Sequence, residues 1–521
     1  MPDAVQRQLQ PDHVGGAHCG RADPARCDRR TASDRRGDHA RRGPVTEPGS
    51  SARQPVSWPE SLDVVGSELS LPLVDGRCVT GVDFDRAATT PCLVVVEEAV
   101  RSFLPWYGSV HRGAGCKSSV TTDVFEGARQ QVAGFLGARD DDTVAFVRNT
   151  TEAANLLAHV VEGAVDVVVF EIEHHANLLP WRRSGAEVLD LPPTRAELLD
   201  KIEERARVKR SRPWLLALTA VSNVTGELLP IADAAEIVHR GGGRIFVDAA
   251  QLAAHKRIDM AASGIDYLAM SGHKLYAPFG SGVLVGRRDW LERSEPLLHG
   301  GGAVILVTSE GVSWKPAPDR LEAGTPNVLG AVALAAACRA LSGVGMDVVE
   351  ELESILSAEL DAALELVPTL SRLTMWGLDG PHVGVACFEV ASVEHGLVAA
   401  VLGAEHGIAV RHGCFCAHLL VRDLLHVSRR DATDAAHRVE IGDAVRLPGA
   451  VRASIGVGTS LEDIARLSKA LIEIVQEGPR WTYCSTADGE MRPDPDPRVL
   501  PGFDDLVAAR SNGDSRRGQL W

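Results

Sequence analysis

Two cysteines separated by one residue, with histidines close by, are the first feature of this sequence that could do chemistry. Residues 410–421 read VRHGCFCAHLLV and contain Cys414, Cys416, His412 and His418. A zinc site usually pairs CxxC-type or well-separated ligand sets, and no convincing partner set stands elsewhere in the chain. A disulfide within CxC would close a small, strained ring. Two interpretations remain: the cysteines are buried as small hydrophobic side chains, or one of them acts as a thiolate nucleophile.

A second candidate is Lys274, which follows a predicted strand among small residues in MSGHKLYAPFGSG. A lysine in a partly desolvated pocket loses proton affinity and can form a Schiff base with an aldehyde. Upstream, the run IFVD ends at Asp248 and Gln251 follows. A carboxylate there could keep a pyridine nitrogen protonated, which is the electron-sink requirement of pyridoxal phosphate chemistry. Taken singly, Lys274 also fits a surface lysine, and Asp248 a helix N-cap.

The composition fits a globular protein and argues against two classes of partner. Of 521 residues, 45% are hydrophobic and 24% charged, which is enough apolar material for more than one domain. A formal net charge of -16 argues against a nucleic acid or an anionic membrane surface, since both need concentrated basic charge. No uninterrupted apolar run reaches membrane-spanning length. The ten cysteines are scattered, so we expect a reducing cytoplasm.

The pattern along the chain predicts the elements that must position these side chains. From about residue 82 to 341, short Val/Ile/Leu-rich runs alternate with longer helical patterns, which is typical of a mainly parallel sheet covered by helices. Most of the runs end in polar residues, where the carboxyl ends of strands bind ligands in open α/β sheets. A helical pattern near residue 345 and the runs HVGVACFEV and GIAVRHG predict a smaller α+β domain.

These patterns divide the chain into four regions. We expect residues 1–55 to be disordered, because they are rich in Arg, Asp, Gly and Pro and have almost no apolar periodicity. Residues 56–341 are predicted to form the large domain with an N-terminal lead-in, and residues 342–480 the small C-terminal domain. The Pro/Asp/Arg-rich residues 481–521 are predicted to form a loose tail.

Segments in the same order from roughly residue 80 to 475 resemble one known family. They are DFDRAATTP, YGSVHRGAG, FVRNTTEAANLLA, EHHANLLPW, VSNVTGELLPI, VDAAQ, SGHKLYAPFGSGVL, GGGAVI, EAGTPN, GIAVRHGCFCA and VRASIG. The chain resembles the class V aminotransferase superfamily of fold-type I pyridoxal phosphate enzymes, and most closely the SUF-type cysteine desulfurases and selenocysteine lyases. The resemblance implies a large cofactor domain with a mainly parallel sheet, a smaller C-terminal domain and desulfuration of L-cysteine.

Carried over to this sequence, the resemblance assigns roles around the cofactor ring. It gives Lys274 the Schiff base with pyridoxal 5'-phosphate, and Asp248 the pyridinium nitrogen. It places Gln251 and Asn223 near the phenolic oxygen. The first histidine of EHHAN, His174, is the one that stacks on the ring; the alternative is a satisfied polar histidine at a strand end.

The resemblance also implies a phosphate site. It lies where a loop opens into a helix in NTTE, at Thr150 and Thr151, because a helix N-terminus favours an anion. Ser271 and His273 would add donors. Thr325 in EAGTPN matches a residue that reaches the phosphate of the neighbouring subunit, so the resemblance implies a homodimer with shared sites.

For the substrate, Arg452 in VRASIG matches the arginine that grips the α-carboxylate, a bidentate task suited to guanidinium. Arg411 and His111 match further active-site positions. The family's reactive cysteine stands five positions after an arginine and precedes an alanine, which selects Cys416 and Ala417. Its thiolate would attack the sulfur of the substrate, release L-alanine and keep a persulfide for an acceptor protein or a reductant.

Three departures from the family pattern keep other functions open. Cys414 stands where many relatives carry histidine and could intercept sulfur, and Arg86 replaces a usual asparagine. The interval between Cys416 and Arg452 is longer than in compact members, which predicts an inserted lid or docking loop. The alternatives are an aminotransferase or another pyridoxal phosphate lyase or epimerase acting on amino acids, and a binding protein without turnover. No metal is expected.

Overall fold

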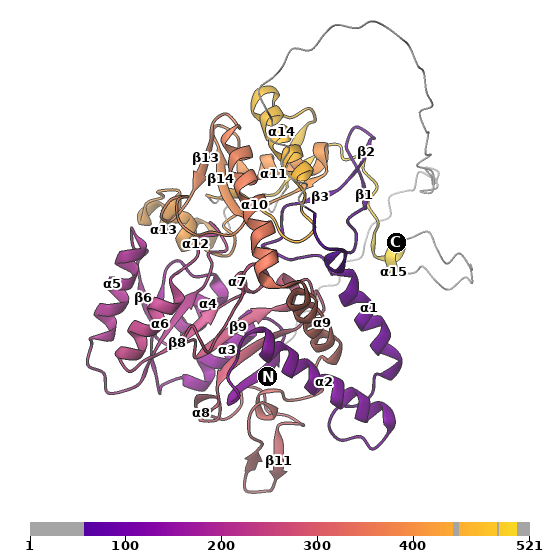
Figure 1. Ribbon diagram of the computed structural model, residues 1–521. Helices are drawn as coiled ribbons and strands as arrows, with labels where there is room; N and C mark the ends of the chain where they lie inside the picture. The colour runs from indigo at the N-terminus through magenta and orange to yellow at the C-terminus, as the bar shows by residue number, and fades with distance from the viewer. Residues whose placement is uncertain (1–56, 441–447, 487–488, 508–521) are drawn as a thin grey trace, which may run out of the picture. The chain divides into compact units, whose positions relative to one another are not determined.

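The computed structural model describes residues 57–440, 448–486 and 489–507, so the expectation for residues 1–55 lies outside the described residues. The centre is a seven-stranded sheet in the order β4-β10-β9-β8-β7-β5-β6 (Figure 1). All its strands run parallel except β10, which is antiparallel to both neighbours. The fold is therefore α/β with a mostly parallel sheet, as predicted. The strands are β4 (Asp142–Val147), β5 (Asp166–Phe170), β6 (Glu187–Leu189), β7 (Trp214–Thr219), β8 (Arg244–Asp248), β9 (Tyr267–Ser271) and β10 (Gly282–Arg287).

Helices bury both faces of this sheet, which explains why its central strands are apolar throughout rather than alternating. Along β7, Leu215 and Ala217 pack into one hydrophobic cluster, and Leu216 and Leu218 into the other. The helices of this part are α1 (Val94–Phe103), α2 (Cys116–Phe135), α3 (Thr150–Val161), α4 (His175–Arg183), α5 (Arg195–Ala206), α6 (Ile231–Arg240), α7 (Leu252–His255), α8 (Arg288–Leu291) and α9 (Val328–Val344). Short 3-10 turns are η1 (Glu60–Leu62), η2 (Leu104–Trp106), η3 (Gly272–Lys274) and η4 (Asp319–Leu321).

A second, antiparallel sheet forms the smaller domain, in the order β13-β14-β17-β16. Its strands are β13 (Leu370–Leu373), β14 (Val385–Val390), β16 (Arg411–Gly413) and β17 (Ala450–Ser454). Helices α10 (Met346–Glu365), α11 (His395–His406) and α14 (Leu461–Glu477) share its hydrophobic cluster. The chain turns from α9 into α10 at Gly345, whose φ of 94° is a conformation that glycine adopts without steric penalty. This break lies close to the predicted domain boundary at 341/342.

Strand pairings at both ends of the described chain add detail to the predicted regions. The lead-in, assigned to the large domain of residues 56–341, pairs β3 (Val82–Asp83) with β15 (Ile408–Ala409) of the smaller domain. The predicted loose tail, residues 481–521, contains a hairpin. The hairpin is anchored because Glu405 accepts hydrogen bonds from the N–H groups of Arg480 and Trp481. Contacts between segments far apart in the sequence therefore position both the lead-in strand β3 and the hairpin in the tail. The remaining elements here are β1 (Ser70–Pro72), β2 (Cys78–Thr80), β18 (Tyr483–Ser485), β19 (Met491–Pro493) and α15 (Phe503–Val507).

The long interval after Cys416 contains two helices, α12 (His418–Leu424) and α13 (Arg429–Glu440), and residues 441–447 of it lie outside the described residues. Helix α12 buries Leu420 and Val421 in the core of the large domain. Arg422 forms an ion pair of 3.1 Å with Glu171. The first half of the interval is therefore packed against the large domain. The expectation of a lid or docking loop stays a prediction for the rest.

A projecting hairpin of β11 (Val304–Val307) and β12 (Val312–Trp314) completes the elements (Figure 1). Among the described helices, none alone combines the length and apolar character needed to cross a membrane; α9 and α10 meet that criterion only as a pair bent by 81°.

Candidate functional site

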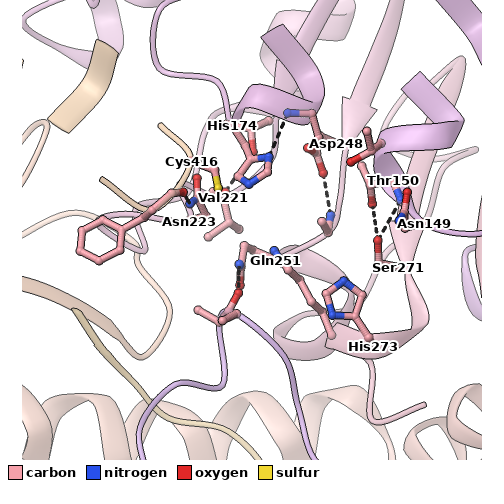
Figure 2. Close-up of a pocket in the computed structure, with 18 of the residues that line it drawn as sticks. Asn149, Thr150, His174, Val221, Asn223, Asp248, Gln251, Ser271, His273 and Cys416 are labelled. Carbon is pink, nitrogen blue, oxygen red and sulfur yellow. Dashed lines mark hydrogen bonds between the residues drawn. The ribbon is translucent and has the colours of Figure 1, made fainter. Parts of the chain in front are cut away.

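A cavity of about 230 Å³ lies at the carboxyl ends of β7, β8 and β9, where ligands bind in open α/β sheets (Figure 2). The cavity brings together all the predicted site residues except His111 and Thr325. Those that line it are Thr150, Thr151, His174, Asn223, Asp248, Gln251, Ser271, His273, Lys274, Arg411, Cys416 and Arg452.

One end of the cavity is suited to an anion. Helix α3 begins there at Thr150, and Asn149 caps it by accepting a hydrogen bond of 3.1 Å from the N–H of Glu152. The backbone N–H of Thr150 donates to Ser271 Oγ at 2.8 Å, and the two hydroxyl oxygens also lie 2.8 Å apart. Hydroxyl groups fixed at a helix N-terminus meet the requirement for binding a phosphate.

Asp248 ends β8 and is 4% exposed. Its Oδ1 accepts a hydrogen bond of 2.9 Å from the N–H of Ala250. Burial raises the pKa of the Asp248 carboxyl, and the Lys274 ammonium opposes that rise. A buried carboxylate of this kind is stabilised by a cationic group in the cavity, such as a protonated ring nitrogen.

Lys274 follows β9 at the end of η3. Burial lowers the pKa of its amine to about 8, although the carboxylate of Asp248 acts in the opposite direction. A lowered pKa increases the fraction of neutral amine, which is the form that attacks a carbonyl carbon. The structure thus supports the reactive-amine interpretation of Lys274 over the surface-lysine one.

The ring of His174 lies at the cavity wall (Figure 2). Its Nδ1 accepts a hydrogen bond of 3.0 Å from the N–H of Ala176 and so caps α4. Burial and then the nearby Lys274 lower the pKa of His174 to about 3. Because Nδ1 is an acceptor, the proton of the neutral ring sits on Nε2.

Gln251 and Asn223 line the cavity, and each also ties the cavity wall to a distant backbone segment. Gln251 Nε2 donates to the carbonyl of Ala87 at 2.7 Å, and Asn223 Nδ2 donates to the carbonyl of Phe415 at 2.8 Å (Figure 2). The second contact joins the large domain to the loop that carries Cys416. No local signal in the sequence indicates these two bonds.

Arg452 is 3% exposed and sits on β17. It donates to the carbonyl of Asn223 at 2.7 Å and forms an ion pair of 3.2 Å with Asp85. Arg411 also pairs with Asp85, at 3.4 Å. Burial raises the pKa of Asp85 despite both arginines. Sequence reasoning missed Asp85, which lies in DFDRAATTP and occupies both arginines as a carboxylate ligand would.

The loop of Cys416 has an unusual backbone. Phe415 and Cys416 have φ angles of 51° and 54°, in the left-handed region that non-glycine residues adopt only at a cost of about 1–3 kcal/mol each. Two bonds from the large domain hold this conformation: Asn223 donates to the Phe415 carbonyl, and the His175 N–H donates to the Cys416 carbonyl at 2.8 Å. The loop presents an exposed Cys416 thiol that also lines the cavity.

The neighbouring thiol has a different environment. Cys414 is partly buried, and its thiol donates to the carbonyl of Pro448 at 3.0 Å. Burial, and then the nearby Cys416, raise the pKa of Cys414. The structure therefore distinguishes the two cysteines of the CxC motif. Among the described residues, His, Cys, Asp and Glu do not form a group of three or more that could hold a metal ion.

His111 and Thr325 lie together elsewhere, in a second cavity lined also by Gly301 and Gly302. His111 Nε2 is 2.9 Å from Glu126 Oε1. Within one chain, therefore, the structure does not bring these two predicted residues to the cavity that holds Lys274.

The chain shares sequence and fold with characterised families. The family described as aminotransferase class-V matches residues 82–467. A probable cysteine desulfurase of Halalkalibacterium halodurans is 35% identical over 401 residues, 75% of this chain and 92% of that protein. Cysteine desulfurase CsdA of Escherichia coli is 36% identical over 354 residues, 66% and 86% of the two chains.

Solved structures of cysteine desulfurases have a fold similar to that of this chain. The crystal structure of the Escherichia coli cysteine desulfurase CsdA, in an S-sulfonic acid form, superimposes with a TM-score of 0.64 at 33% identity and covers 75% of this chain and 94% of its own. The apo cysteine desulfurase from Thermococcus onnurineus gives a TM-score of 0.66 at 30% identity, with 76% and 95% covered.

Proposed function

The chain belongs to the class-V aminotransferase family, and we propose that it is a pyridoxal phosphate-dependent cysteine desulfurase. The observation that carries this proposal is the presence of the Cys416 thiol in one cavity with the Lys274 amine and the buried Asp248. Curated relatives at 33–36% identity carry the name cysteine desulfurase.

The donor set of the cavity fits pyridoxal 5'-phosphate. Thr150, Thr151 and Ser271 would hold the phosphate at the start of α3, with His273 nearby. Asp248 would face the ring nitrogen, His174 the ring, and Lys274 the aldehyde carbon, while Gln251 and Asn223 line the same wall. When bound, the cofactor supplies an electron sink for the α-carbon of an amino acid.

The chain's own groups then bind the substrate and move its proton. Arg452, with Arg411, would exchange its contact with Asp85 for the α-carboxylate of L-cysteine. Arg452 Nε is buried with no hydrogen-bond partner among the described residues, so a further acceptor would satisfy it. Lys274 Nζ, with its lowered pKa, would accept the α-proton and return it.

Cys416 Sγ would take the sulfur. The thiolate attacks the sulfur of L-cysteine; a new S–S bond forms as the substrate's C–S bond breaks, and the carbon receives a proton. L-cysteine and the Cys416 thiol are thus converted to L-alanine and a Cys416 persulfide, with all atoms accounted for. A protein or small thiol then accepts the outer sulfur. We also propose a reducing cytoplasmic location, because the ten cysteines are scattered through a long chain and do not form the dense framework of a small secreted domain.

We also propose a homodimer. His111 and Thr325 line a second cavity, and the nearby hairpin β11–β12 exposes Ile305 and Val307 at 67% and 60%. Exposed apolar side chains of this size favour contact with another protein surface. A molar mass of two chains by light scattering would support the dimer, and a stable monomer with full activity would exclude shared sites.

The function is tested by incubating purified protein with L-cysteine and measuring alanine and sulfide. We expect Lys274→Ala to lose covalent cofactor attachment, and Cys416→Ala to lose desulfuration while retaining the cofactor. Cys484→Ala, which removes another exposed thiol, is the matched control and should behave as wild type. Full desulfuration by Cys416→Ala would refute the nucleophile, and pyruvate or a keto acid in place of alanine would indicate a lyase or an aminotransferase.

A further inference from the structure

Two stacked imidazole rings lie beside the nucleophile loop and outside the cavity. His175 begins α4 and His418 begins α12, two residues after Cys416. Their ring centroids are 4.8 Å apart with an interplanar angle of 19°. The backbone N–H of His175 donates to the Cys416 carbonyl at 2.8 Å, so the pair is tied to the loop. The residues that line the cavity include Cys416 and neither ring.

The contact between the rings defines which nitrogen donates. His418 Nδ1 lies 3.1 Å from His175 Nε2, so one must carry a proton and the other must accept it. The backbone N–H of His418 also points to His175 Nε2, at 3.4 Å. His175 Nε2 is therefore the acceptor and His418 Nδ1 the donor. Burial, and then the charge of His418, lower the pKa of His175, which keeps that ring neutral.

This arrangement leaves His418 Nε2 as the atom that can gain a proton. When it does, the Nδ1–H of the resulting imidazolium still donates to His175 Nε2, as a charge-assisted bond. In the general pattern for activating a nucleophile, one ring nitrogen of a histidine acts as the base while the other donates to a group that orients the ring, as His418 Nδ1 does to His175 Nε2. His418 is exposed, as is the Cys416 thiol, so both are accessible to an incoming molecule.

Other titratable groups near the loop are poorly suited to serve an incoming acceptor. Burial lowers the pKa of His174 to about 3, so its ring is a weak base. Lys274 lies in the cavity with Asp248. The Cys414 thiol has a raised pKa and donates to a carbonyl. Both ring nitrogens of His412 already have partners, His395 Nδ1 and Glu490 Oε2, each at 3.2 Å. These environments leave His418, two residues after Cys416, as the exposed base adjoining the loop.

We propose that His418, oriented by His175, is the general base for discharge of the Cys416 persulfide to a thiol acceptor, an inference that rests on the proposed function. The acceptor's S–H proton passes to His418 Nε2 while its sulfur attacks the outer persulfide sulfur. A new S–S bond forms to the acceptor, and the S–S bond to Cys416 breaks with its electron pair on Sγ. The proton then passes to that thiolate. The products are an acceptor persulfide and a free Cys416 thiol, with no added oxidant or reductant.

The test separates the two half-reactions in the cofactor-loaded enzyme. The first is the burst of alanine formed per subunit from L-cysteine without a thiol; the second is the loss of the Cys416 persulfide after 2-mercaptoethanol is added, followed by mass spectrometry. In His418→Gln we expect the discharge rate at pH 7 to fall at least about tenfold more than the burst. His437→Gln removes an exposed histidine of α13 and is the matched control.

The pH dependence distinguishes a base from a merely structural residue. Without the base only the free thiolate of the acceptor attacks, so the discharge rate of His418→Gln should rise about tenfold per pH unit and meet the wild-type rate near the acceptor's own pKa. His175→Phe, which keeps a stacked ring without Nε2, should show an intermediate loss at pH 7 and a pH slope between those of wild type and His418→Gln. Wild-type discharge by His418→Gln at pH 7, or equal slowing at every pH, would overturn the proposal. A wild type that forms no alanine would instead refute the proposed function, and this inference with it.

Discussion

The lowered proton affinity of Lys274 leads to a prediction about how fast the protein attaches its cofactor. Burial lowers the pKa of this amine to about 8, from an ordinary value of 10.5. Only the neutral amine attacks an aldehyde, so the rate of covalent attachment of pyridoxal phosphate to cofactor-free protein should follow the neutral fraction. The prediction can therefore be tested by measuring the attachment rate at different pH values.

The expected size follows from the two pKa values. At pH 7 about one Lys274 amine in eleven is neutral, against about one in three thousand for an ordinary lysine, so attachment should be about 300-fold faster. Between pH 7 and 9 the neutral fraction of Lys274 rises only about tenfold and then levels off. For an ordinary lysine, it would rise about 100-fold over the same range and continue to rise.

The assay mixes cofactor-free protein with saturating pyridoxal phosphate, reduces samples with borohydride and measures cofactor fixed at Lys274 by mass spectrometry. Asp248→Asn removes the charge that raises the pKa of Lys274, so its plateau should begin at a lower pH. Lys469→Gln, an exposed lysine, is the control and should leave the profile unchanged. A wild-type rate that increases about eightfold between pH 9 and 10 would show that Lys274 is an ordinary solvated amine and refute the reasoning.

Three further predictions concern single side chains. Arg452→Lys should raise KM for L-cysteine about tenfold or more, because an ammonium cannot form the forked contact; steady-state kinetics with unchanged KM would contradict this. Arg129→Leu should lower the free energy of unfolding by about 3–5 kcal/mol, because it leaves Glu322 buried without its cation. Scanning calorimetry measures this loss, and adding Glu322→Leu to the same protein should partly reverse it. Glu173→Gln should lower the free energy of unfolding by about 1–3 kcal/mol, because an N–H donor of the glutamine would face the Asn177 Nδ2 that donates to Glu173. An unchanged melting temperature would disprove this.

Local pattern and one topological rule indicate where candidate side chains gather, and the family resemblance supplies the roles predicted for them. Asp248 and Ser271 end apolar runs, and Lys274 follows the second of them. In a parallel sheet such ends meet at one edge, and the structure places them there in one cavity. A carboxylate and an amine at that edge are compatible with pyridoxal phosphate chemistry, and the family resemblance then implies that cofactor.

Contacts between segments far apart in the chain could not be predicted from the sequence. Asp85 lies within a motif that the sequence analysis quoted, yet its pairing with Arg452 and Arg411 depends on how β17 and β16 approach it. The left-handed backbone of Phe415 has no local signal, because the residue is not glycine or asparagine. The hairpin at β18 also arose where polar composition predicted a loose tail, since anchoring to Glu405 outweighs composition.

The position of Cys416 depends on both domains at once. Its loop continues from β16 of the smaller domain, but the carbonyls of Phe415 and Cys416 are held by Asn223 and His175 of the large one. Because the left-handed backbone is unfavourable by itself, those two bonds help to stabilise it, together with the burial of Phe415. The placement of the Cys416 thiol therefore depends on contacts from both domains.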